Sequence, residues 1–195
     1  LTDDLNDYSV FHQIISRNPK ANTMEILFVA SKLSDVNSYS SIVKKAGLNP
    51  VIMDVKCFTL KNAFDNTSKI ENKSNNALLE IGSEDNYLII VHDNIPIITD
   101  IFLRTNEKDA LANYKNNAQT DENDATNVIR RYSLQLKQAL SDYEGKHGIK
   151  INNIKVVSNL NNIEDLIPAF RKNLLNTGLQ VFDPLSELSI PEYNK

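Results

Sequence analysis

Acidic side chains gather in one short stretch of this sequence, residues 82–86 (GSEDN), which closely follows Glu80. Two carboxylates such as those of Glu80 and Asp85 can form an acid–base pair. The same residues also suit a solvated turn between two strands, because apolar runs flank them on both sides. The turn is the simpler interpretation, so we expect no catalytic carboxylate pair here.

The other reactive side chains lack partners at the spacing that catalysis or metal binding requires. His12, His92 and His147 lie far apart in the sequence, and none has a Cys, His or Glu at ligand spacing. We interpret His147 as a charge partner of a helix C-terminus. Cys57 has no neighbouring histidine, and no serine stands in a Gly-x-Ser-x-Gly motif. The sequence therefore predicts no catalytic residue and no metal ligand.

Composition sets the class of protein. The 195 residues include 41% hydrophobic and 24% charged side chains, which is ordinary globular usage. A net charge of -4 with dispersed Lys and Arg argues against nucleic-acid binding. No apolar run approaches the roughly 20 residues that span a bilayer. A single cysteine favours a reducing compartment, so we expect a cytoplasmic protein. Because Leu1 is not an initiator methionine, we expect a fragment or a processed form.

The first third of the sequence predicts a small α+β unit. Gly47, preceded by Lys44 and Lys45, is typical of a helix C-terminus. A polar, breaker-rich stretch, 65–76, is the best candidate for a linker. The expected elements before it are a hairpin of strands at 7–16 and 24–30, a helix from Ser34 or Asp35 to Ala46, a buried strand at 51–55 and a helix at 58–64.

The remainder predicts alternating strands and helices. The polar stretch 104–127 is expected to be exposed helix and loop, and the C-terminal tail to be loosely held. The expected elements are strands at 77–81, 87–91 and 95–102, a helix at 128–143, a strand at 154–157, a helix that starts near Pro168 and a strand at 179–182.

The segment from Ala46 to Phe64, AGLNPVIMDVKCFTLKNAF, matches the pattern A-G-L-x-P-V-x-x-D-V-x-x-F-x-L-x-x-A-F. This pattern resembles the PilM family, the actin-like proteins of type IV pilus assembly, and the resemblance extends from about Leu5 to Leu185. It implies an α/β fold that is part of the actin-like ATPase fold. Residues 1–68 would be the inserted α+β subdomain that PilM shares with the cell-division protein FtsA. Residues 69–195 would be the second, RNase H-like lobe with a shortened insertion near 104–127, and the N-terminal lobe would be missing.

The resemblance also implies a phosphate-binding hairpin of the form Asp-x-Gly-x-x-x-Thr. Here Glu80 replaces Asp, Gly82 is retained and Asn86 replaces Thr, while Glu84 and Asp85 add charges that repel phosphate. Family members also carry a glycine pair beneath the adenosine, where this sequence has Ser158, Asn159 and Leu160. The expected equivalents of the nucleotide site are therefore degenerate: Glu80, Gly82, Ser83, Asn86, Ser158 and Asn159.

The function that the resemblance implies is that of an adaptor. It would be cytoplasmic and peripheral to the inner membrane, and it would bind the cytoplasmic tail of a PilN-like membrane protein and connect to pilus motor ATPases. We expect no enzymatic activity and no cofactor. One alternative is an ATP-binding switch that uses ATP and Mg²⁺ in the same machinery. Another is the cytoplasmic domain of a type II secretion platform protein, and self-association stays open.

Overall fold

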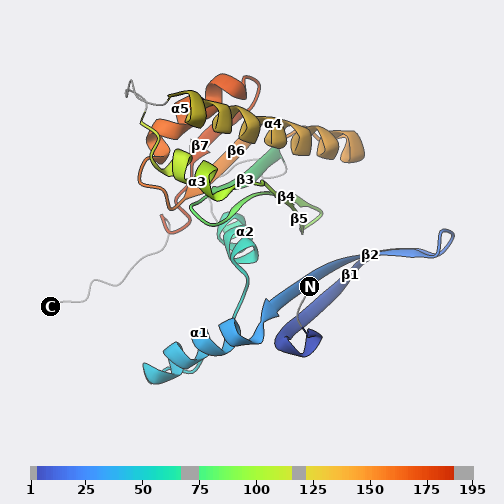
Figure 1. Cartoon of the computed structure of the whole chain (residues 1–195). Helices are drawn as coiled ribbons and strands as arrows, with labels where there is room; N and C mark the ends of the chain where they lie inside the picture. Colours follow the sequence, from blue (N-terminus) through green and yellow to red (C-terminus); the bar gives the residue numbers. More distant parts are fainter. Residues whose placement is uncertain (1–3, 67–74, 116–121, 187–195) are drawn as a thin grey trace. The chain divides into compact units, whose positions relative to one another are not determined.

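The computed structural model describes residues 4–66, 75–115 and 122–186 (Figure 1). The chain divides into two compact units, the first ending at Asp54 and the second beginning at Val55. The sequence placed this division at residue 68. The predicted linker 65–76 lies largely outside the described residues, as does the predicted C-terminal tail from residue 187 onward.

The first unit contains an antiparallel hairpin followed by a helix. A 3-10 turn, η1 (Leu5–Asp7), precedes β1 (Tyr8–Asn18), β2 (Thr23–Lys32) and α1 (Leu33–Lys45). The helix ends at Gly47, whose φ of 78° is left-handed and whose amide donates to Lys44 O at 3.0 Å. The hairpin and the glycine-terminated helix confirm the sequence prediction.

The predicted buried strand at 51–55 is wrong. The backbone forms no strand there, and the side chains of Val51 and Ile52 are 80% and 85% exposed. A strand needs a neighbouring strand for its backbone hydrogen bonds, and β1 and β2 pair only with each other in the described residues. Every described residue from 4 to 54 is exposed or only partly buried. The described part of this unit therefore has no buried core.

The second unit is built on a five-stranded mixed sheet in the order β5-β4-β3-β6-β7. β4 runs antiparallel to β3 and β5, whereas β6 and β7 run parallel to β3. This arrangement confirms the expected α/β fold with an RNase H-like sheet. The strands are β3 (Asn76–Ile81), β4 (Asn86–His92), β5 (Ile95–Asp100), β6 (Asn153–Ser158) and β7 (Gly178–Val181).

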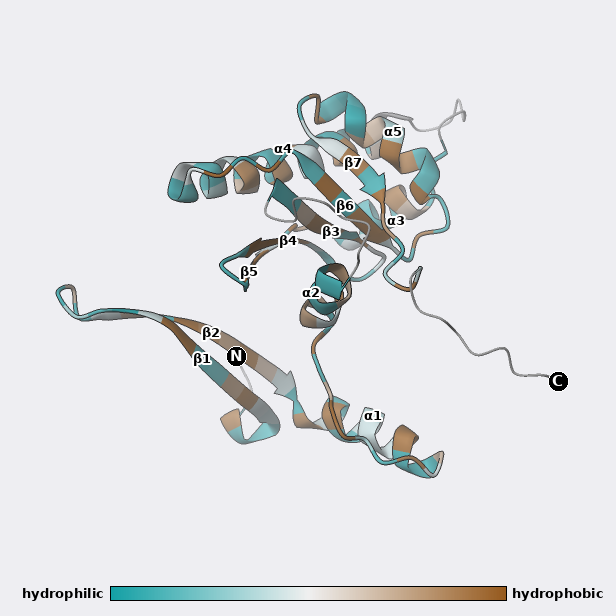
Figure 2. Cartoon of the chain, turned by 180° about the vertical axis from the view of Figure 1, so that it is seen from behind, coloured by the Kyte–Doolittle hydropathy of each residue, from teal (hydrophilic) through white to brown (hydrophobic). Residues whose placement is uncertain are grey.

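Helices cover both faces of this sheet. The larger core joins one face to α3 (Thr105–Ala112), α4 (Glu122–His147) and α5 (Ile163–Asn173). In it the rings of Tyr132 and Phe170 meet edge to face with centroids 5.1 Å apart. Figure 2 shows hydrophobic residues along the central strands that these helices cover.

The other face carries α2 (Lys56–Asn66) and a smaller core. Phe64 of α2 is buried against Leu78 and Tyr87 of the sheet and meets Phe182 edge to face. The sequence assigned this helix to the first unit, but its buried aromatic ring belongs to the second. Burying a phenylalanine contributes about 1.5–3 kcal/mol, which explains the placement.

Two helices differ from their predicted bounds. α4 begins at Glu122 rather than Val128, within the polar stretch. α5 begins at Ile163, so Pro168 lies inside the helix rather than at its start. The burial of four apolar side chains of α5 stabilises the helix by more than the loss of the backbone hydrogen bond that proline cannot donate destabilises it.

Candidate functional site

A hairpin joins β3 and β4 at the position where the sequence predicted a phosphate-binding one. Ile81 of β3 pairs with Asn86 of β4, and residues 82–85 form the turn between them. A Cβ atom at Gly82 would lie 2.8 Å from Asp85 O, closer than packing allows. The turn can therefore form in this shape only because residue 82 is glycine.

The hairpin lies beside the loop that follows β6. Ile81 and Ser158 are register partners in the parallel pair β3–β6. The Ser158 hydroxyl donates to Ile81 O at 2.6 Å and accepts from Leu160 N at 3.0 Å. The structure thus brings together the predicted site residues at the carboxyl ends of two parallel strands, where ligands bind in open α/β sheets. Their role in nucleotide binding stays a prediction.

The backbone amides of the turn donate to side chains of the same chain. Asn86 Oδ1 accepts from Gly82 N at 3.3 Å, and Asn86 Nδ2 donates to Gly82 O at 2.9 Å. Asn159 Oδ1 accepts from Ser83 N at 3.1 Å, and its Nδ2 donates to Ser83 Oγ at 3.2 Å. A phosphate that approached these two amides would have to displace both asparagine side chains.

The carboxylate of Glu80 is buried and engaged. Its side chain is 2% exposed and forms an ion pair with Lys56 Nζ, which also lies 3.4 Å from Asp85 Oδ2. Partial burial lowers the pKa of Lys56, but the hydrogen bond and charge of Glu80, together with Asp85, outweigh it and hold that pKa above its ordinary value. Lys56 therefore stays charged and occupies Oε1 of Glu80, whereas Oε2 is buried without a hydrogen-bond partner among the described residues.

Two tyrosines complete the base of the hairpin. The Tyr132 hydroxyl lies 3.1 Å from Glu80 O and 3.3 Å from Asn86 Oδ1 and donates to these acceptors. Complete burial, and then the charge of Glu80, raise the pKa of Tyr132. Burial and Glu80 also raise the pKa of Tyr87, the register partner of Glu80. Both hydroxyls therefore remain protonated under ordinary conditions.

The charge at this hairpin is more balanced than the sequence suggested. Lys56 lies between Glu80 and Asp85, and Lys108 Nζ donates to Glu84 O at 2.5 Å. Repulsion of phosphate by the acidic turn is therefore weaker than expected. Sequence reasoning missed Lys56 because it lies on a different element, 24 positions before Glu80.

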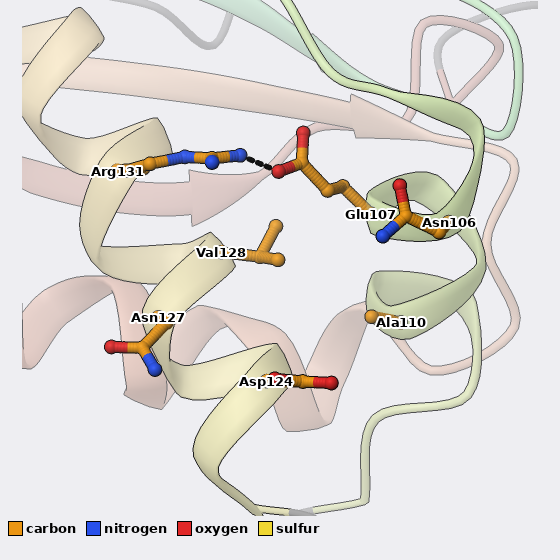
Figure 3. A pocket seen from close by; sticks show the side chains of 7 residues that line it. All are labelled: Asn106, Glu107, Ala110, Asp124, Asn127, Val128 and Arg131. Carbon is orange, nitrogen blue, oxygen red and sulfur yellow. Dashed lines mark ion pairs between the residues drawn. The ribbon is translucent and has the colours of Figure 1, made fainter.

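Two polar cavities lie next to α3. One, of about 270 Å³, lies between α3 and α4, and the side chains of Glu107 and Arg131 point toward each other across it as an ion pair (Figure 3). The other, of about 490 Å³, lies at the end of α3 and the start of α5. There Asn162 Nδ2 donates to Leu111 O and Tyr114 O, both at 2.8 Å. Neither cavity was predicted from the sequence.

The chain matches a protein-family model. No helix in the described part is both long and apolar enough to cross a membrane. No curated protein sequence matches the chain. The family model of type IV pilus assembly protein PilM matches residues 5–108, which is more than half of the chain and includes most of the first unit and the β3–β4 hairpin, but not Ser158 and Asn159. The resemblance predicted from the sequence extended to Leu185, whereas the match ends at residue 108. The strands beyond the match, β6 and β7, belong to the same sheet as β3, β4 and β5. The chain therefore belongs to the PilM family of type IV pilus assembly proteins.

Proposed function

We propose that this protein is a cytoplasmic adaptor of type IV pilus assembly, peripheral to the inner membrane, which binds the cytoplasmic tail of a PilN-like membrane protein and does not hydrolyse ATP. The observation that carries the proposal is that side chains of the same chain already occupy the backbone amides of the hairpin turn. The amides of Gly82 and Ser83 donate to Asn86 and Asn159, and Glu80 is paired with Lys56.

The energetic consequence can be estimated. Each neutral hydrogen bond contributes about 0.5–1.5 kcal/mol, and both asparagine contacts must break before a phosphate can bind. That loss weakens nucleotide binding by about tenfold to a hundredfold relative to a hairpin with open amides. The residues present do not fit ATP with Mg²⁺ in this arrangement, so no step of hydrolysis is assigned to them.

The first unit supports a role in protein binding. Its described residues lack a buried core, while Phe11 and Phe28 on the hairpin are 68% and 50% exposed. β1 and β2 form a two-stranded sheet, so each strand has an outer edge that an extended peptide can join by backbone hydrogen bonds. We propose that the tail of the membrane partner adds to this hairpin.

A binding experiment tests the adaptor role. A fluorescent peptide with the sequence of the PilN-like tail is titrated with the full chain, and a scrambled peptide serves as a control. We expect saturable binding that Phe11→Ser weakens at least tenfold. Leu175→Ser is the matched control, because Leu175 is 84% exposed but lies in the second unit. Equal binding of the scrambled peptide, or equal loss in both variants, would contradict the proposal.

One observation favours the second candidate, an ATP-binding switch. The cavity of about 490 Å³ borders the loop after β6, and Asn162 Oδ1 beside it is buried without a hydrogen-bond partner among the described residues. The exocyclic amine of a purine could donate to that oxygen. Calorimetric titration with ATP-Mg separates the two candidates, because micromolar affinity would favour the switch and undetectable binding the adaptor.

A further inference from the structure

Two histidines from different elements meet at one end of the second unit. His92 is the last residue of β4, and His147 is the last residue of α4. Their ring centroids are 4.1 Å apart and their planes are tilted by 46°. Tyr143, one turn before His147 on α4, has its ring centroid 4.8 Å from that of His147. The sequence, in which these histidines are 55 positions apart, gave no indication of this contact.

Tyr143 orients the imidazole of His92. Its hydroxyl lies 3.0 Å from His92 Nδ1. Burial, and then the charge of Asp93, raise the pKa of Tyr143, so its hydroxyl stays neutral. When Nδ1–H of His92 donates to this oxygen, the lone pair is on Nε2. An outer partner that fixes one ring nitrogen in this way is the usual companion of a metal-ligating histidine.

The electrostatic surroundings favour a cation. Asp93 Oδ2 lies 3.7 Å from His92 Nε2, and its side chain is 87% exposed. His147 stands in the last turn of α4, where the backbone carbonyls give the helix end a partial negative charge. His92 is only 25% exposed, so a bound ion would be shielded from solvent on one side.

We propose that His92 and His147 together bind one divalent transition-metal ion, Zn²⁺ or Cu²⁺, with water molecules as the remaining ligands. Imidazole nitrogen suits both ions. In the described residues no group of three or more His, Cys, Asp and Glu side chains is arranged to hold a metal. The site is therefore an exchangeable one with two protein ligands, unlike a closed structural zinc site. The bound ion would join the end of β4 to the end of α4 and stabilise the second unit.

The test uses the full chain without a histidine tag. Zn²⁺ is titrated by calorimetry well below the melting temperature, and the melting temperature is then measured with and without the ion. We expect one ion per chain and a rise in melting temperature of about 5 °C at a zinc concentration 100-fold above the dissociation constant. His147→Gln should abolish both effects.

His12→Gln is the matched control, because His12 is exposed on β1 in the first unit. It should bind Zn²⁺ as the unaltered chain does. Tyr143→Phe should weaken binding by about tenfold to a hundredfold while leaving one ion per chain, as the loss of an outer partner does. Cu²⁺ added to the unaltered chain should give an electron paramagnetic resonance spectrum with coupling to two nitrogens.

Three results would overturn the proposal. One is the absence of saturable binding by the unaltered chain. Another is equal binding by the His147→Gln and unaltered chains. The third is a loss of Zn²⁺ binding in His12→Gln as large as that in His147→Gln. Because binding is measured by calorimetry below the melting temperature, a variant with reduced stability still gives an interpretable result.

Discussion

The ammonium group of Lys56, the first residue of α2, binds the buried carboxylate of Glu80 in β3. This contact joins the helix to the base of the candidate phosphate hairpin. The lysine side chain is 52% exposed, whereas that of Glu80 is 2% exposed. The negative charge of the buried Glu80 carboxylate is therefore balanced by a lysine side chain that is half exposed to solvent.

Replacing Lys56 by methionine should destabilise the protein by about 1–2 kcal/mol, because it leaves a buried carboxylate unpaired while the lost charge was partly screened by solvent. Urea unfolding measures the change. Lys137→Met, at an exposed position of α4, is the control and should be neutral. The double variant Lys56→Met with Glu80→Gln should recover part of the loss. A further loss in the double variant would refute this account of the pair.

Stability should fall as the pH rises above about 10. The pKa values of Lys56 and Tyr132 are higher in the folded protein than their ordinary values of 10.5 and 10.0. Protons are bound more tightly in the folded state, so this stability is present below the ordinary pKa values and is lost as pH rises through the folded ones. Unfolding in urea at a series of alkaline pH values measures the decline. The free energy of unfolding should decline less with pH in Tyr132→Phe. A decline as steep as that of the unaltered chain would contradict a contribution from Tyr132.

Gly82→Ala should destabilise the protein by about 1–3 kcal/mol, because the new Cβ would meet Asp85 O at 2.8 Å. Gly145→Ala is the matched substitution, since a Cβ there has no neighbour within 4 Å and the residue lies inside α4. It should stabilise the protein by about 0.5–1 kcal/mol through helix propensity. Thermal unfolding compares the two variants. Stability changes of the same sign and similar size in the two variants would show that close packing at the turn does not cause the destabilisation by Gly82→Ala.

Replacing Asn159 by glycine should strengthen nucleotide binding. The change frees Ser83 N–H from its 3.1 Å hydrogen bond and removes the side chain that covers it. We expect calorimetric titration to detect ATP-Mg binding by this variant, with an affinity about tenfold above the upper limit set for the unaltered chain. Asn161→Gly, two positions along the same loop and with no hydrogen bond to the hairpin among the described residues, is the control. An unchanged affinity in Asn159→Gly would remove the physical basis of the proposed blockage.

Local patterns predicted the hairpins well. Residues 78–91 place apolar runs on both sides of a polar turn, and the structure forms that hairpin. Gly47 ended the first helix as expected. These features depend on residues close together in the sequence, where side-chain alternation and glycine conformation are decisive.

The structure of residues 51–55 and the contacts within the candidate site depend on residues that are distant in the sequence. Residues 51–55 have strand-like composition, yet no described strand pairs with them, and residues 51–54 are exposed. The contacts of Glu80 with Lys56 and of Ser83 with Asn159 join residues 24 and 76 positions apart. Such long-range pairings leave no periodic signal in a single sequence. The sequence therefore predicted the hairpin that carries the candidate site, but not the hydrogen bonds and the ion pair that occupy its polar groups.

None of the described residues of the first unit is buried, and this affects how the protein's unfolding must be measured. Heat absorbed on unfolding and the associated heat-capacity change scale with the surface newly exposed to water. A calorimetric trace will consequently report almost entirely on the sheet of the second unit and its helices. The state of the β1–β2 hairpin has to be followed by amide hydrogen exchange, residue by residue, where fast exchange along both strands would accompany an unchanged calorimetric transition.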